Sequence, residues 1–432
     1  MLRLVKLIPA VCVMLFFLVR QFYVNLLHID RTVFSAVFVL AMTGLGALFL
    51  WHRTEHLCPR LLALDAIVFG QFLLAILVIP LYWLSGKTET GMTIYALYFH
   101  AIAPFLLYAG FYFRSQSSTR VQRYLIAGSL VFIAMCIAGF FQVLGFEGWL
   151  FKNENFAFQS TFLGTHRATG GYGTQIDFGL LSFIVFACAF YIVREKKSKW
   201  FSFMVLVGLG GIFLSVSRVF IFAAACVLVC AIRRNAILEI LKRPRLLLPI
   251  GVGLLVTVLA VQELNLIPIF VAADTVTQSS NEDRVTFVKT LPRWIFIDYP
   301  IVGTGPGTQN GPNEEANKLI GDGLWFGMLI EFGFLAGLPL IVLKLGLVLL
   351  VILNYFRLKH RSAIARISLA LAVCFLGASF VDSAFANVVS LSIFYIVAGC
   401  FLLESYGLGL LPSSAMDPLR PAHRFHSARQ AS

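Results

Sequence analysis

The chain carries a series of long apolar runs separated by short polar segments, and these runs constrain its fold more than any other feature. A helical run of about 20 residues matches the roughly 30 Å hydrocarbon core of a membrane. About twelve such runs can be traced, near residues 7–27, 32–51, 61–84, 93–113, 124–144, 175–193, 200–217, 219–232, 246–265, 333–353, 367–381 and 388–407. The pattern predicts an all-α, polytopic transmembrane bundle in which residues 1–411 form a single integral membrane domain.

Composition and charge support this class and set an orientation. Apolar residues make up 59% of the chain, charged residues 13%, and the mean hydropathy is +0.86, which excludes an ordinary soluble domain. Of the 34 lysines and arginines, 23 fall on the side that holds both termini and nine on the opposite side. Cytoplasmic loops retain excess positive charge, so both termini are predicted to be cytoplasmic. The net charge of +13 then reflects topology and contact with anionic membrane lipids, and no nucleic-acid partner is expected.

Two outer segments are long, near 145–174 and 266–322, whereas the other outer connections are short. The first apolar run is interpreted as a membrane helix and not as a signal peptide, because no small-residue cleavage site follows it. Residues 412–432, rich in Pro, Ser, Arg and His, predict a disordered cytoplasmic tail. None of the eight cysteines lies in an outer segment, so neither a disulfide framework nor a metal site is expected.

Three arginines stand out on the outer side, namely Arg167, Arg218 and Arg284. A guanidinium is always charged and can grip phosphate oxygens with two parallel hydrogen bonds, so this set suits a lipid-linked pyrophosphate. The alternative is that each arginine binds a lipid headgroup or pairs with a carboxylate. Arg218 favours function most strongly, because it follows Ser217 at the membrane edge, where a charge is costly.

A glycine-rich turn, Gly303-Thr304-Gly305-Pro306-Gly307, lies in the second long outer segment. Glycine permits positive φ and close approach, so the N–H groups of Gly303, Gly305 and Gly307 are candidates for binding the pyrophosphate. An ordinary turn is the alternative, and the stretch lacks the Lys-Ser/Thr ending of a nucleotide-binding P-loop.

The order of these pieces is more specific than any one of them. The pieces are Arg167 with Gly170, Ser217-Arg218, Arg284 with Trp294, the stretch Pro300-Ile301-Val302-Gly303-Thr304-Gly305-Pro306-Gly307, and Asp322 ahead of Leu329-Ile330-Glu331-Phe332-Gly333. In this order they resemble the O-antigen ligase and polymerase superfamily of bacterial envelope glycosyltransferases. The resemblance covers roughly residues 167–337.

The resemblance implies a multi-span, GT-C-like membrane glycosyltransferase of the bacterial inner membrane, with its active face in the periplasm. Its donor would be a polyprenyl-pyrophosphate-linked oligosaccharide, without nucleotide sugar or cofactor. Ligases of the family usually carry His followed by Asn where this chain has Asp322-Gly323. Asp322 or His166 is therefore the candidate for the catalytic group that activates the acceptor hydroxyl. The alternative for Asp322 is that it caps the helix that follows it.

The missing histidine favours a polymerase that joins repeat units of exopolysaccharide, capsule or O-antigen. A ligase that transfers glycan to lipid A core is the alternative within the family. Chain-length regulators and export proteins would be further partners. Outside the family, a lipid-linked oligosaccharide flippase or another transporter is the second alternative, and its candidate charges within the spans are Arg20, Asp65 and Lys344. A structural scaffold is a third.

Overall fold

Apolar helices make up almost all of the chain that the structure describes. The computed structural model describes residues 62–88, 90–115, 118–143, 161–162, 165–166, 168, 175–196, 198–215, 217–231, 293, 296–297, 301–306, 324–358, 362–381 and 388–405. Its α-helices are α4 (Leu62–Leu84), α5 (Thr90–Leu97), α6 (Leu106–Ser115), α7 (Ser118–Val143), α8 (Gln175–Lys196), α9 (Lys199–Ser215), α10 (Arg218–Ala231), α16 (Leu324–Phe332), α17 (Leu338–Arg357), α18 (Ala363–Val381) and α19 (Val388–Ser405).

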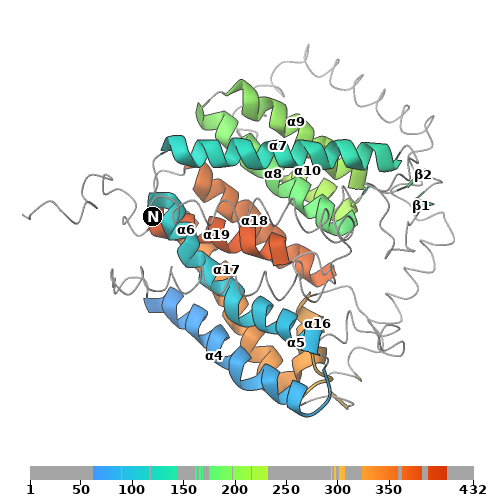
Figure 1. Cartoon of the computed structure of the whole chain (residues 1–432). Coiled ribbons are helices and arrows are strands. Elements are labelled where there is room, and N and C mark those ends of the chain that lie inside the picture. Colours follow the sequence, from blue (N-terminus) through green and yellow to red (C-terminus); the bar gives the residue numbers. More distant parts are fainter. Residues whose placement is uncertain are drawn as a thin grey trace, which may run out of the picture.

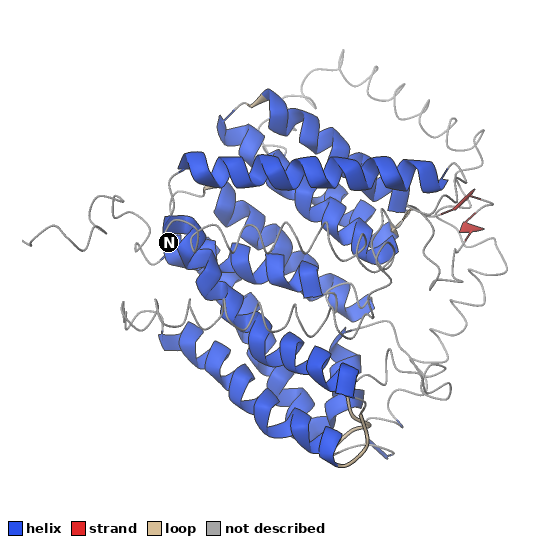
Figure 2. Ribbon diagram, viewed as in Figure 1, coloured by secondary structure: helices blue, strands red, loops and turns tan. Residues whose placement is uncertain are grey.

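Two two-residue strands are the exception to this helical architecture, as Figure 2 shows. β1 (Thr161–Phe162) pairs antiparallel with β2 (Thr165–His166), with Thr161 opposite His166. This hairpin lies in the first long outer segment and was not expected from the sequence. The strands are too short to show the alternating pattern by which a strand is recognised.

Within the described residues, three helical stretches are long and apolar enough to cross a membrane, judged by length and composition: Leu62–Leu84, Thr90–Phe111 and Leu324–Arg357. They coincide with predicted spans, and they fit a helical membrane protein. Shorter apolar stretches of 10–17 residues lie within α7, α8, α9, α10, α18 and α19, which fall in further predicted spans. The total of about twelve spans stays a prediction. The expected spans near 7–27, 32–51 and 246–265, and the expected tail at 412–432, lie outside the described residues.

Two of the long stretches are not regular α-helices throughout. The second contains a π-helical turn, η2 (Tyr98–Ile102), and a 3-10 turn, η3 (Ala103–Phe105), before α6 begins. Pro104 explains part of this break, because proline has no N–H group to donate to the preceding helical turn. In the third, the π-helical turn η5 (Gly333–Gly337) separates α16 from α17. Gly333 has a φ of +61°, a value that glycine adopts readily.

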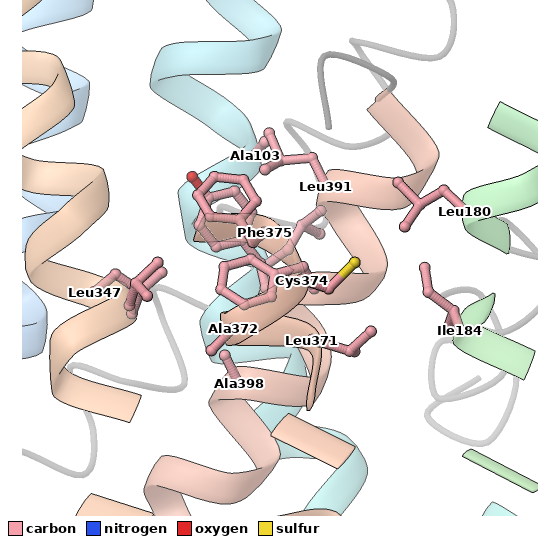
Figure 3. Packing of buried hydrophobic residues seen from close by; sticks show 14 of the residues in the cluster. Ala103, Leu180, Ile184, Leu347, Leu371, Ala372, Cys374, Phe375, Leu391 and Ala398 are labelled. Carbon is pink, nitrogen blue, oxygen red and sulfur yellow. The ribbon is translucent and has the colours of Figure 1, made fainter. Parts of the chain in front are cut away.

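The core lies where α18 and α19 pack between α17 on one side and α8 on the other. Figure 3 shows Leu347 of α17 facing Phe375, with Leu180 and Ile184 of α8 beyond Leu391 on the opposite side. The Phe375 ring stacks on Phe394 at a centroid distance of 4.9 Å and an interplanar angle of 2°.

Helices α6 and α19 approach each other most closely at two glycines. A Cβ atom on Gly110 would lie 2.6 Å from the backbone nitrogen of Cys400, and one on Gly399 would meet the backbone of Leu107. Small residues allow this backbone contact, which is a common way to pack helices in membranes. The Cys400 thiol donates to the Gly110 carbonyl at 3.1 Å across the same contact.

We call one end of the bundle the turn end, because it holds the α4–α5 connection, residues 301–306 and the start of α17. Figure 1 shows α16 and the α4–α5 connection along its right-hand side, with the β1–β2 hairpin on the same side above them. The end of α17 and the start of α18 lie at the opposite end.

Candidate functional site

The glycine turn at 301–306 is tied to the last residues of α16 by backbone hydrogen bonds. The Thr304 N–H donates to the Ile330 carbonyl and the Gly305 N–H to the Glu331 carbonyl, both at 2.9 Å. The Thr304 hydroxyl donates to the Ile330 carbonyl as well, at 3.2 Å. The last carbonyls of a helix have no partner within it, so the turn supplies donors that α16 lacks.

Further bonds hold the same turn from two other sides. The Leu335 N–H of η5 donates to the Ile301 carbonyl at 3.1 Å. The Tyr82 hydroxyl, near the end of α4, donates to the Val302 carbonyl. The turn therefore connects α4, α16 and η5 into one unit at the turn end.

Gly303, Gly305 and Gly333 are required by this arrangement. Gly303 and Gly305 have φ values of +73° and +102°, a region that other residues rarely adopt. A Cβ atom on Gly303 would lie 2.6 Å from the Gly333 nitrogen, and one on Gly305 would lie 2.9 Å from the Thr88 hydroxyl. Positive φ and tight packing thus account for these glycines without a ligand.

The predicted phosphate role of the turn gains no support from this geometry. The N–H groups of Thr304 and Gly305 donate to protein carbonyls, so neither is directed at a bound pyrophosphate. Gly307 lies outside the described residues. The role of Gly303, Gly305 and Gly307 in binding pyrophosphate stays a prediction.

The segments that carry Arg167 and Arg218 meet beside α8. The N–H of Ala168, the residue after Arg167, donates to the Leu214 carbonyl near the end of α9 at 3.1 Å. Ala168 is fully buried, and its Cβ is 3.1 Å from where a Cβ on Gly139 of α7 would lie. Leu214 precedes Arg218, the first residue of α10, by four positions.

Small residues let the start of α10 pack directly on α8. A Cβ atom on Gly179 of α8 would lie 2.8 Å from the Ser215 hydroxyl, 3.1 Å from the Ser217 Cβ and 2.9 Å from the Phe220 ring. The Ser215 hydroxyl donates to the Ile212 carbonyl at 2.7 Å. The backbone at Arg218 is therefore fixed by α8, α9 and the segment around Ala168.

The structure describes only part of the predicted site. His166 lies in β2 and Arg218 begins α10, and for both the backbone alone is described. Arg167, Arg284 and Asp322 lie outside the described residues. Whether the three guanidinium groups converge on one pyrophosphate stays a prediction, as do the catalytic roles of Asp322 and His166. In the described ranges no group of three His, Cys, Asp or Glu side chains could hold a metal ion.

A second polar region lies inside the bundle, and we call it the interior polar cluster: Gln71 of α4, His100 of η2, Lys344 of α17 and Tyr395 of α19. All four side chains are buried, with Lys344 only 1% exposed. The Lys344 ammonium donates to the Tyr395 hydroxyl at 3.2 Å. That hydroxyl donates in turn to Gln71 Oε1 at 3.5 Å.

Aromatic rings surround the Lys344 ammonium. Its Nζ atom lies 4.8 Å from the centroid of the Phe99 ring and 5.9 Å from that of Tyr395. Such contacts stabilise a cation through the ring's negative face. Two atoms at this place have no hydrogen-bond partner within the structure, His100 Nδ1 and Gln71 Nε2. An unpaired buried polar group is costly, so both atoms mark the cluster as unusual.

The interior polar cluster borders the unit that holds the glycine turn. The His100 ring meets Phe332, the last residue of α16, at a centroid distance of 5.1 Å. Phe332 also contacts the Tyr82 ring, at 6.0 Å. A continuous series of aromatic contacts therefore leads from the turn end to the polar groups in the interior.

Only one feature of the sequence indicated this cluster, the lone Lys344 in an apolar run. Gln71, His100 and Tyr395 each lie on a separate helical segment, and single polar residues in apolar runs are usually satisfied locally. Asp65, the other charge expected within a described span, accepts a hydrogen bond from the Tyr108 hydroxyl at 2.7 Å. It lies in the first turn of α4, where the helix dipole favours a carboxylate.

These two regions, the Arg218 segment at the start of α10 and the interior polar cluster, are the candidates that the described residues offer. A comparison of the chain with models of protein families finds no match, and a comparison with curated proteins finds none either.

Proposed function

We propose that this protein is a membrane glycosyltransferase that polymerises oligosaccharide repeat units carried on polyprenyl pyrophosphate. The sequence supports the proposal through the ordered set of motifs between residues 167 and 337. The resulting polymer would be a bacterial exopolysaccharide, capsule or O-antigen, made at the periplasmic face of the inner membrane.

One structural observation carries the proposal furthest, the hydrogen bond from the Ala168 N–H to the Leu214 carbonyl. It joins the residue that follows Arg167 to the last turn of α9, four residues before Arg218. These two arginine segments are separated in sequence by α8 and α9, and their adjacency could not be read from the sequence. Two arginines on neighbouring segments at a membrane edge suit the two phosphates of a pyrophosphate.

The chemistry needs little more than positioning and charge stabilisation. The acceptor hydroxyl oxygen attacks the anomeric carbon of the donor sugar, and the bond from that carbon to the pyrophosphate oxygen breaks. The hydroxyl proton passes to a base, for which Asp322 and His166 are the candidates. Polyprenyl pyrophosphate leaves with the bonding electrons, and Arg167, Arg218 and Arg284 would stabilise its growing charge.

The test uses a deletion strain complemented with wild type, Arg218→Ala or Arg357→Ala. Arg357 is exposed at the far end of α17 and is the matched control for loss of one arginine. We expect Arg218→Ala to reach the membrane at wild-type amounts, to make at least about 100-fold less surface polymer, and to accumulate lipid-linked repeat units. Arg357→Ala should make normal polymer.

Normal polymer from Arg218→Ala at equal protein amounts would overturn the proposal. Glycan analysis of the deletion strain separates the two enzyme functions. Loss of a polymerase leaves single repeat units, whereas loss of a ligase leaves long chains that are not attached to lipid A core.

Transport is a second candidate function, and buried Lys344 is the observation that favours it. A charged residue deep within a bundle is typical of transport pathways. A flippase moves lipid-linked units to the outer leaflet, so its loss would leave them on the inner leaflet. In intact cells these units would resist an added glycosidase, whereas units left by a missing polymerase would be cleaved.

A further inference from the structure

Lys344 is a buried lysine whose described contacts include no negative charge. Its polar contact is the Tyr395 hydroxyl, and its other contacts are the rings of Phe99 and Tyr395. Among the residues that the structure describes, no carboxylate pairs with it. Removing a charge from water is expensive, and a neutral hydroxyl and two rings compensate that cost only in part.

The hydrogen bonds of the cluster run in one direction and leave donors unused. Lys344 donates to Tyr395, and Tyr395 donates to Gln71 Oε1, so both acceptor groups are occupied. Within the described residues, the Gln71 amide nitrogen, which can only donate, has no partner. His100 Nδ1 has none among them either and can donate when it carries a proton. The described part of the cluster thus contains no acceptor with negative charge.

The local backbone is unusual at the same place. His100 belongs to the π-helical turn η2, and Phe332, which its ring contacts, directly precedes the π-helical turn η5. Single π-helical turns within α-helices occur often at functional sites. The contact between His100 and Phe332 thus joins η2 to the residue just before η5, beside the unpaired donors of the cluster.

We propose that the interior polar cluster binds an oxyanion, a phosphate or carboxylate group, between Lys344, Gln71 and His100. The Lys344 ammonium supplies the charge, and the Gln71 amide and His100 Nδ1–H donate hydrogen bonds to the anion's oxygens. The site does not depend on the outer arginines, so it stands apart from the proposed glycosyltransferase site.

The anion could belong to a free solute or to a lipid headgroup, and two measurements distinguish these sources. The first follows thermal unfolding of the full-length protein in neutral detergent with sodium phosphate, against sodium chloride of equal ionic strength. The second follows unfolding in nanodiscs of phosphatidylcholine, with and without phosphatidylglycerol. A rise in the melting temperature with phosphate identifies a free anion, and a rise only with phosphatidylglycerol identifies a headgroup. Absence of a rise in both measurements overturns the proposal.

The variant Lys344→Met shows whether the response arises at this cluster. We expect it to lose the anion-dependent rise and, without anion, to melt at or above the wild-type temperature, because an uncompensated buried charge has been removed. Arg357→Met, which removes an exposed charge from the same helix, should keep the full rise. Gln71→Leu should reduce it. A wild-type response from Lys344→Met, or a lower melting temperature without anion, would overturn the proposal by making Lys344 a structural residue.

Discussion

Single glycines allow the close backbone packing at the turn end. Replacing them should therefore destabilise the protein. Gly303→Ala or Gly333→Ala should each destabilise the protein by about 1–3 kcal/mol, because alanine is strained at positive φ and its Cβ would meet backbone atoms of the facing segment. The melting temperature of the purified protein measures this cost. Gly128→Ala is the control, because a Cβ on that residue of α7 meets nothing within 4 Å. Alanine there should leave stability unchanged or raise it by up to about 1 kcal/mol.

This prediction also separates packing from ligand binding. If Gly303→Ala kept wild-type stability but made no polymer, the glycines would return to the phosphate role expected from the sequence. The glycines in the sequence indicated a turn that permits positive φ. They did not indicate which segment the turn would pack against. The carbonyl of Ile330 lies 26 residues beyond Thr304, and such a distant partner leaves no local pattern. The bond between Tyr395 and Gln71 joins residues 324 positions apart and was equally hidden.

The individual helices were easier to predict from the sequence than their irregularities and the way in which they pack. The apolar run predicted at 61–84 corresponds to α4 (Leu62–Leu84). A hydrophobic pattern over many residues indicates a helix more clearly than any single residue does. The run at 93–113 was predicted as one apolar span, and the structure adds that η2 and η3 interrupt its α-helix around Pro104. The apolar stretch that contains the predicted span near 333–353 begins earlier, with α16 at Leu324. The π-helical turn η5, which starts at Gly333, separates α16 from α17 within this stretch.

The contact between α6 and α19 gives a prediction about helix packing. Gly399→Ala and Gly110→Ala should each lower stability by about 1–3 kcal/mol, because the added methyl group meets the backbone of the other helix and the two helices must separate. Gly377→Ala in α18 is the matched control, since a Cβ there meets nothing within 4 Å. Melting temperature and the yield of monodisperse protein measure the effect. A wild-type melting temperature for Gly399→Ala would show that the helices are less closely packed than described.

The orientation of the bundle decides which chemistry the turn end can serve. The described helices place Arg194, Lys199, Arg357 and Arg366 near the end opposite the turn end. Positive charge is retained on the cytoplasmic side, so the turn end should face the periplasm. The proposed polymerase requires this orientation, because its lipid-linked donor and acceptor would already have crossed the membrane.

Single cysteines introduced at the two ends test this orientation. Ser85, in the α4–α5 connection, and Arg357, at the end of α17, are both exposed. We expect a membrane-impermeant maleimide to label Ser85→Cys in intact spheroplasts above the wild-type background, and to label Arg357→Cys only after the membrane is opened. Labelling of both variants in opened membranes shows that both thiols are reachable. The reverse pattern would place the turn end in the cytoplasm. A periplasmic polymerase would then be ruled out, whereas oxyanion binding by Lys344, which depends on neither face, would still stand.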